Sequence, residues 1–290
     1  MRIFFEWWRG RIQHIFIGKK RNEPFIQGIL TANCVFWWKF WFAVAAIFYF
    51  LLKMPWPIIG RRIIIKGEEN IRDLPAENCL CLPNHGSLLG PPLISFAWML
   101  PGGMGSLVKV LKNPEKYFVW QTPNREVTKD MFMAVGGMAP QIVIHSDESG
   151  MPKDHVGLLA LCRRLQTNRV VTFIEGTRSG HAREPKTKTK SGIEIGYPFR
   201  GVGLAIYYSR PLAIPVLIRG EEDIFPIGAS IRSAVKNLLF SQKRLEVIFG
   251  SPMDISWVPV NNRKATSAEN KEIARIISEK VVQEIAALDN

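Results

Sequence analysis

The segment NHGS, residues 84–87, holds the clearest candidates for chemistry in this sequence. His85 follows a short apolar run, lies between Asn84 and Gly86, and precedes Ser87 and a helix that opens on prolines, so we expect it at a strand end, in a cleft. An imidazole there can serve as a general base near working pH. A single histidine is more often structural, so both interpretations stay open on local grounds. A carboxylate that orients the base is expected five residues on, where the chain has Gly90.

A second candidate is FIEGTRSG, residues 173–180, in which polar residues follow directly on an apolar strand pattern. Gly176 lets the backbone approach a ligand closely, and Thr177 offers a hydroxyl and an amide. Arg178 offers a planar fork that matches phosphate oxygens. Together with Glu175 these residues predict a phosphate cradle, although a strand-to-helix turn with a surface arginine is the ordinary alternative.

A third stretch, residues 198–220, combines PFRG at a helix start with the strand LAIPVLI. The amino terminus of that helix, with Arg200 beside it, can add to an anion site. The same pattern also fits a purely structural strand–helix–strand unit.

The elements around these residues alternate between strands and helices. Strands are predicted over 61–67, 77–84, 141–145, 169–176, 212–218 and 244–250, and helices over 91–100, 154–167, 201–209 and 267–288. This alternation predicts an α/β fold with a largely parallel central sheet flanked by helices. Sites in such sheets collect at the carboxyl ends of strands, where His85 and Glu175 are expected. The polar, basic stretch 181–192 is predicted to be a mobile loop.

Composition narrows the class of function. The net charge of +13 indicates an anionic partner: nucleic acid, anionic lipid or a phosphorylated substrate. The four cysteines (Cys34, Cys79, Cys81 and Cys162) have no metal-ligand spacing and are interpreted as reduced core thiols of a protein that faces the cytoplasm. A nucleophile elbow, a nucleotide-binding glycine loop and a zinc-protease motif are all missing from the sequence.

Residues 1–56 are predicted to be an aromatic, basic membrane-attachment segment, followed by an α/β domain over residues 57–290. The segment holds six of the nine tryptophans, and from 25 to 52 it is almost wholly apolar. A helix over 28–52 is long enough to span a bilayer, but Lys39 at its centre costs about 3 kcal/mol. Interfacial attachment is therefore favoured over a span. Nucleic acid is not the expected partner, because binding it does not need such an apolar stretch.

These stretches together resemble the glycerolipid acyltransferases, the lysophosphatidic acid and glycerol-3-phosphate acyltransferases. NHGSLLG is similar to that family's NHxSxxD motif, FIEGTRSG to FPEGTRS, and PFRG and LAIPVLIRG to two later blocks, in the family's order over roughly residues 60–255. The resemblance implies acyl transfer in phospholipid biosynthesis from acyl-CoA or an acyl carrier protein to a hydroxyl of a glycerophosphate-type membrane lipid. It implies His85 as the base and Glu175, Gly176, Thr177 and Arg178 at the acceptor's phosphate. No metal or redox cofactor is implied.

Three positions depart from the family pattern. Gly90 replaces the aspartate that holds the imidazole, Ile174 replaces a proline, and His145 stands where an arginine is expected. The first is the most consequential, because losing the orienting carboxylate costs about 10⁴ in rate in a protease triad. Three hypotheses follow. In the first, another acid (Asp147, Glu148 or Glu175) or a backbone carbonyl orients His85. In the second, the protein binds lipid or acyl donor at the membrane without fast turnover. In the third, Gly90 is an introduced change.

Overall fold

The computed structural model describes the elements that position these residues. The described residues are 43, 46–47, 49–54, 63–75, 77–86, 90–101, 104–112, 119–121, 155–175, 186–226, 229, 233, 236–237, 240, 243–260 and 267–290. The predicted strand at 141–145 and most of the segment 1–56 lie outside them.

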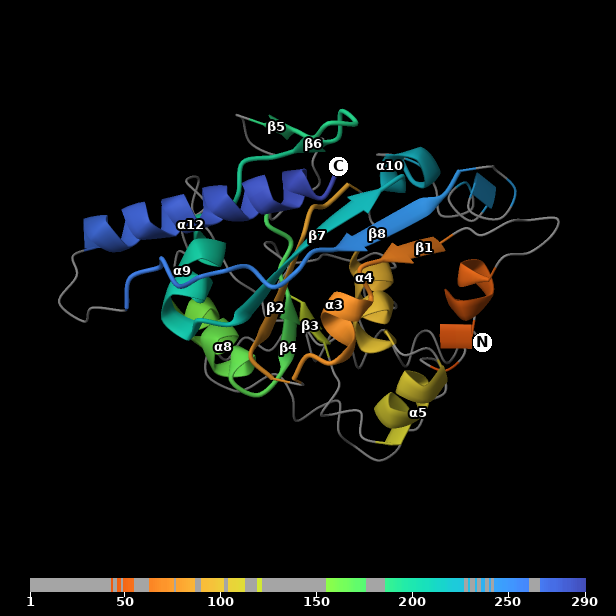
Figure 1. Ribbon diagram of the computed structural model, residues 1–290, viewed down its shortest axis with the longest axis horizontal. Helices are drawn as coiled ribbons and strands as arrows, with labels where there is room; N and C mark the ends of the chain where they lie inside the picture. The colour runs from red at the N-terminus through yellow and green to blue at the C-terminus, as the bar shows by residue number, and fades with distance from the viewer. Residues whose placement is uncertain are drawn as a thin grey trace, which may run out of the picture.

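A six-stranded sheet forms the centre of the protein (Figure 1). Its order is β1 (Ile63–Lys66), β8 (Leu245–Phe249), β7 (Leu212–Arg219), β2 (Cys79–Pro83), β4 (Arg169–Val171) and β3 (Val119–Gln121). Every neighbouring pair is parallel except β7 with β8. The predicted largely parallel sheet is therefore confirmed, and β2 lies inside it between β7 and β4.

Helices cover both faces of the sheet. One face packs against α4 (Gly90–Met99), α5 (Met104–Lys112) and the helical residues between 46 and 52. The other face packs against α8 (His155–Leu165), α9 (Arg200–Ser209) and α12 (Ser267–Ala287). The short helices α3 (Glu69–Arg72) and α10 (Glu221–Ile224) follow β1 and β7. The result is the three-layer arrangement that parallel sheets adopt because both faces are apolar.

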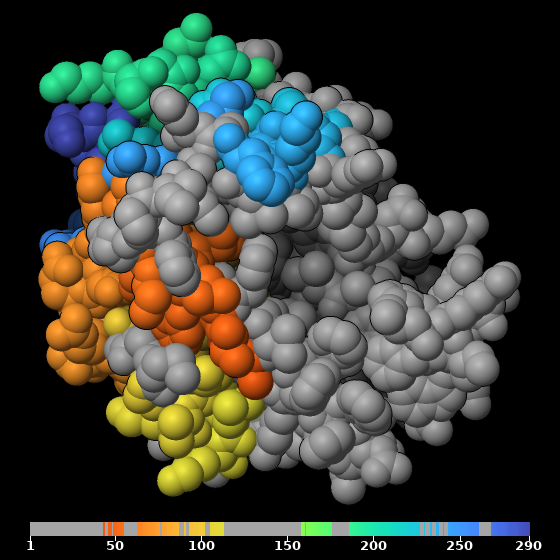
Figure 2. All heavy atoms as spheres, turned by 90° about the vertical axis from the view of Figure 1, so that its right-hand side faces the viewer, coloured from red at the N-terminus to blue at the C-terminus, as the bar shows by residue number. Residues whose placement is uncertain are grey.

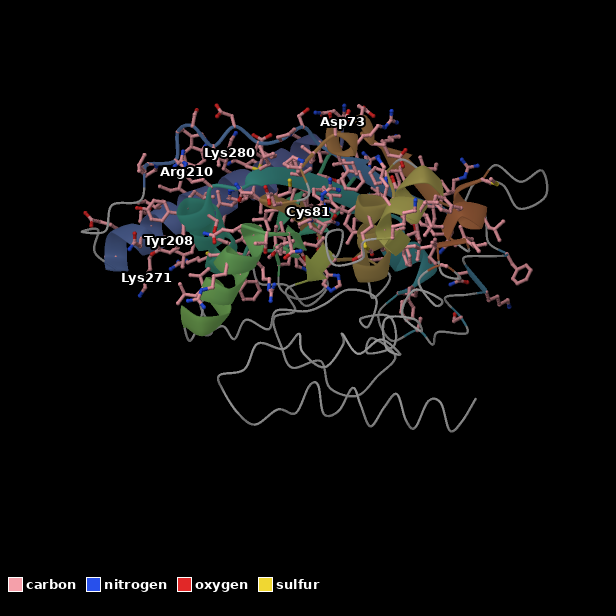
Figure 3. The ribbon with its side chains drawn as sticks, turned by 90° about the horizontal axis from the view of Figure 1, so that it is seen from below. Asp73, Cys81, Tyr208, Arg210, Lys271 and Lys280 are labelled. Carbon is pink, nitrogen blue, oxygen red and sulfur yellow. The ribbon has the colours of Figure 1, made fainter. Side chains whose placement is uncertain are left out.

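The alternation along β2 explains how one strand serves both cores. Cys79 and Cys81 belong to the cluster under α4, whereas Leu80 and Leu82 belong to the cluster under α8, α9 and α12. Figure 3 places Cys81 in the interior. Both thiols are free and wholly buried, and burial raises the pKa of Cys79 to about 11. The interpretation of these two as core thiols is confirmed.

A buried arginine at the start of β4 joins this strand to the loop before β2 and to the end of α4. The Arg169 guanidinium donates to the carbonyl oxygens of Pro75 at 3.0 Å, Leu74 at 2.6 Å and Trp98 at 3.2 Å. Its side chain is only 8% exposed, so these bonds compensate for burying its charge. Arg169 thereby holds β4 against the segment that leads into β2 and against the end of α4.

The packing of α9 on α12 depends on a glycine. The amide of Gly203 donates to the Ser278 hydroxyl at 3.1 Å, and Ser278 in turn donates to the Phe199 carbonyl oxygen at 3.2 Å. A Cβ on Gly203 would lie 2.7 Å from the backbone carbon of Ala274 and 2.8 Å from its Cα. The two helices can approach this closely only because residue 203 has no side chain.

Gly203→Ala is therefore expected to lower the free energy of unfolding by about 2 kcal/mol, since the new methyl group forces two buried backbones apart. Urea unfolding followed by circular dichroism measures the change. Gly105→Ala is the control, because that glycine is exposed on α5 with nothing within 4 Å of the new Cβ. Equal effects of the two substitutions would contradict the packing explanation.

Two sequence predictions are corrected in detail. The strand predicted over 169–176 ends at Val171, although its pairing continues as single hydrogen bonds from Thr172 N to Cys81 O and from Ile174 N to Pro83 O. Part of the predicted loop 181–192 forms β5 (Thr187–Lys188), which pairs with β6 (Glu194–Ile195). Among the residues described, the helices are all too short or too polar to cross a membrane.

Candidate functional site

Asn84 locks the end of β2 to the neighbouring strand. Its amide nitrogen donates to the Ile218 carbonyl oxygen at 3.1 Å, and its Oδ1 accepts from the Ile218 amide at 2.7 Å. The side chain is only 1% exposed, so both bonds are shielded from water. The Asn84 side chain thus continues the hydrogen bonding between β2 and β7 by one more pair of bonds. It thereby fixes the point at which the backbone of His85 departs from the sheet.

Removing the Asn84 side chain is expected to destabilise the protein. Asn84→Ala leaves a buried amide and a buried carbonyl of Ile218 without their partners and should lower the free energy of unfolding by about 3 kcal/mol. Asn84→Asp should also destabilise, because a carboxylate cannot donate to the Ile218 carbonyl. Chemical denaturation gives both values. Asn290→Ala removes an exposed amide that donates to the Ala287 carbonyl at 2.7 Å and should change stability by less than about 0.5 kcal/mol.

His85 lies beside the second motif. Its ring centroid is 4.5 Å from that of Phe173, with the planes tilted by 43°. Phe173 follows β4 directly, and the adjacent Ile174 donates its amide to the Pro83 carbonyl at 3.2 Å. The structure therefore brings residues 84–86 and 173–175 together at the carboxyl ends of two adjacent parallel strands, as expected.

The predicted phosphate-binding residues are only partly described. Glu175 is buried, at 1% exposed, directly after this junction. Gly176, Thr177 and Arg178 lie outside the described residues, as does Ser87. Of the acids proposed from sequence to orient His85, Asp147 and Glu148 also lie outside them. Their roles stay predictions.

Arg200 begins α9, and the chain before it is held to the motif because the Phe199 amide donates to the Ile174 carbonyl at 2.8 Å. The pKa of Glu272 on α12 is lowered mainly by the hydrogen bond and charge of Arg275, and the charge of Arg200 contributes a smaller part. Arg200 is thus near the predicted anion site along the chain, and its charge also acts on Glu272 of the long carboxyl-terminal helix.

Sequence reasoning missed the residue that occupies the space beside Gly90. Gly90 is the buried first residue of α4, and a Cβ built on it would lie 2.5 Å from Oε1 of Glu221 and 3.3 Å from its Cδ. The other oxygen, Oε2, accepts a hydrogen bond of 2.9 Å from the Gly86 amide. Glu221 itself is only 2% exposed. The signal in the sequence was an acid just after a glycine at the carboxyl end of β7.

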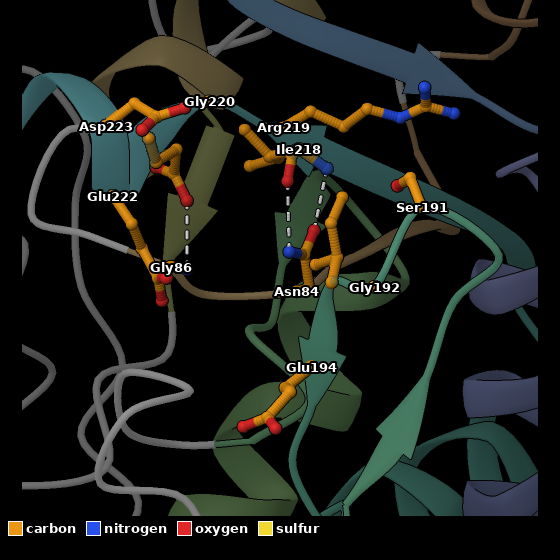
Figure 4. Close-up of a pocket in the computed structure, with 12 residues that line it drawn as sticks. Asn84, Gly86, Ser191, Gly192, Glu194, Ile218, Arg219, Gly220, Glu222 and Asp223 are labelled. Carbon is orange, nitrogen blue, oxygen red and sulfur yellow. Dashed lines mark hydrogen bonds between the residues drawn. The ribbon is translucent and has the colours of Figure 1, made fainter.

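A cavity of about 410 Å³ adjoins the contact between Gly86 and Glu221 (Figure 4). It is lined by Asn84 and Gly86, by residues 191–194 at the turn between β5 and β6 and the start of β6, and by residues 218–223 at the end of β7 and in the segment that follows. Its described lining carries four carboxylates but only one cation, Arg219. That arginine extends away from Gly86 and pairs with Asp289 at 2.5 Å and Glu246 at 3.4 Å. The described lining of the cavity is therefore poorly suited to phosphate.

Comparisons with known proteins add a likeness to solved structures. No model of a protein family matches the chain, and no curated protein matches its sequence. Among solved structures, the 1-acyl-sn-glycerophosphate (LPA) acyltransferase PlsC from Thermotoga maritima is similar to it with a TM-score of 0.42 at 14% sequence identity. That match covers 98% of this chain and 89% of the PlsC chain.

Proposed function

We propose that the protein is an O-acyltransferase that moves a fatty acyl group from an acyl thioester to a hydroxyl of a glycerophosphate-type lipid. The observation that carries the proposal is the junction of the two motifs. Residues 84–86 and 173–175 are far apart in the chain, yet the His85 ring packs on Phe173 and Ile174 is hydrogen-bonded to Pro83. A base and an anion-binding segment at one sheet edge are what this reaction needs.

In the proposed mechanism, His85 takes the proton of the acceptor hydroxyl as its oxygen attacks the thioester carbonyl carbon. The tetrahedral intermediate then collapses and the carbon–sulfur bond breaks. The imidazolium returns its proton to the departing thiolate, so the products are an ester and a free thiol. Gly176, Thr177 and Arg178 would hold the acceptor's phosphate, with Glu175 and Arg200 in support. The thioester is a co-substrate, and the mechanism uses no other cofactor.

Attachment to the cytoplasmic face of a membrane is part of the proposal. The described helical residues between 46 and 53 are apolar on two sides: Ala46, Tyr49 and Leu52 are buried in the core, whereas Ile47 and Leu51 are 51% and 41% exposed. Met54 extends the exposed side. Figure 2 shows this helical segment, in dark orange, on one face together with α5, in yellow. Val108 of α5 is half exposed. An apolar surface of this kind supports contact with lipid.

The test is acyl transfer by the purified full-length protein in phospholipid vesicles. Palmitoyl-CoA and a palmitoyl carrier protein serve as donors, and lysophosphatidic acid and glycerol 3-phosphate as acceptors, with the ester product quantified by mass spectrometry. Enzyme-dependent product supports the proposal. No product with any pair, combined with saturable binding of lysophosphatidic acid or palmitoyl-CoA, would instead support the binding protein that Gly90 makes the second candidate.

A further inference from the structure

The backbone after β7 places Glu221 firmly at the end of β2. Gly220 adopts a left-handed conformation, with φ of 76°, and turns the chain into α10. Ile224 and Phe225, at the other end of α10, are buried. The Ile224 carbonyl accepts a hydrogen bond of 3.0 Å from Asn237, and Lys243 donates to the Asp223 carbonyl at 2.9 Å. Glu221 is thus held by a short, anchored element.

The Glu221 carboxylate lies between the two glycines of the NHGSLLG segment. Oε2 is bound to the Gly86 amide, one residue after His85, and Oε1 points at the side-chain position of Gly90. A buried carboxylate is unfavourable unless hydrogen-bond donors and positive charge compensate it. The Gly86 amide provides one donor, and the amino terminus of the ten-residue helix α4 favours a negative charge nearby.

We infer that Glu221 is the positioning residue for His85 and replaces the carboxylate that position 90 lacks. This inference rests on the proposed function, in which His85 is the base. The carboxylate reaches the same volume from the opposite side, from the end of β7 instead of the start of α4. There its negative charge, beside the backbone that carries His85, would stabilise the imidazolium formed when the base takes its proton. Residue 90 must then be glycine, because Glu221 fills the space of a side chain.

Other charged groups also surround this edge of the sheet. Glu175 follows β4, Glu222 and Asp223 belong to α10, and Arg219 precedes it. Glu222 and Asp223 are exposed, and Arg219 is paired with Glu246 and Asp289. Glu175 is the one alternative buried acid among these groups, so the experiment must separate it from Glu221.

The test substitutes Glu221→Gln, which keeps the size of the side chain and an acceptor for Gly86. We expect kcat to fall by between about 10² and about 10⁴, with KM for the acceptor changed less than about twofold. The pKa of His85, measured by NMR on histidine-labelled protein, should fall by about one unit or more because a nearby negative charge is lost. The His85 resonance is assigned from the spectrum of His85→Gln.

Glu222→Gln is the matched control, since it makes the same change on the same helix at an exposed position. It should leave kcat and the His85 pKa within about twofold and about 0.3 unit of wild type. Glu175→Gln tests the other buried acid. A His85 pKa and a kcat that respond to Glu175→Gln but not to Glu221→Gln would overturn the inference.

The NMR measurement of the His85 pKa does not depend on turnover. The inference about Glu221 and the proposed acyltransferase function can therefore fail separately. Suppose that the wild-type protein shows no transfer activity but that the His85 pKa falls in Glu221→Gln. The inference that Glu221 acts on His85 would then stand, and the proposal that the protein is an acyltransferase would fail. If Glu221→Gln does not fold, the double variant Gly90→Asp/Glu221→Ala moves the carboxylate to position 90. We expect it to restore the His85 pKa to within about 0.5 unit of wild type. A double variant that folds with a His85 pKa lower by a unit or more overturns the inference.

Discussion

His85→Ala is expected to lower kcat/KM for acyl transfer by about 10³-fold. The reason is that the proposed mechanism gives the proton of the acceptor hydroxyl to the His85 imidazole, and alanine has no group that can take it. The loss corresponds to about 4 kcal/mol of transition-state stabilisation. Initial rates with lysophosphatidic acid and palmitoyl-CoA, measured over a range of both substrates, give the value.

Two controls separate chemistry from packing in this experiment. His85→Asn keeps a polar side chain but not a base, so it should be as inactive as the alanine variant. Phe173→Leu removes the ring that packs against His85 while leaving the imidazole, and should cost less than about 30-fold. Activity that survives both substitutions of His85 would exclude it as the base.

Gly90→Asp, which recreates the family motif, is expected to damage the protein. Its Cβ would lie 2.5 Å from Oε1 of Glu221, and its carboxylate would enter a buried space that already holds one. We expect the free energy of unfolding to fall by about 3 kcal/mol and activity to fall with it. Gly90→Ala, which adds bulk without charge, should cost about 1 kcal/mol, and Gly90→Asn should lie between the two.

The pH dependence of stability separates charge from bulk in Gly90→Asp. Two buried carboxylates in contact raise the pKa of the pair, so the folded variant binds a proton that the unfolded chain has already lost above pH of about 4. The stability of Gly90→Asp relative to wild type should therefore fall as pH rises from about 4 to about 7. Gly90→Ala and Gly90→Asn should show no such slope. A gain of activity in Gly90→Asp would instead show that the glycine at position 90 impairs the enzyme.

Much of the fold was predictable because its signals are local. The apolar run before His85 and the β-branched residues of 212–218 predicted two strands that the structure contains as β2 and β7. The helix predicted over 267–288 is α12, Ser267–Ala287. The short elements were missed: β3 has three residues and α10 has four, too few to show a period. The β5–β6 pairing was missed because its strands are polar and two residues long.

The sequence by itself determined the longer strands β1, β2, β7 and β8 and the start of β4, and that His85 and Glu175 follow two of these strands, because periodicity and strand ends are properties of neighbouring residues. The order of the sheet, which puts β2 between β4 and β7, came only from the tertiary structure. The position of Glu221 depends on that order: it meets Gly86 across 135 residues of chain because β2 and β7 are paired and Gly220 turns inward. Such a contact cannot be predicted from neighbouring residues. From the sequence, Gly90 indicates that an expected carboxylate is missing. In the folded protein, the absence of a side chain at Gly90 leaves the space that the Glu221 carboxylate occupies.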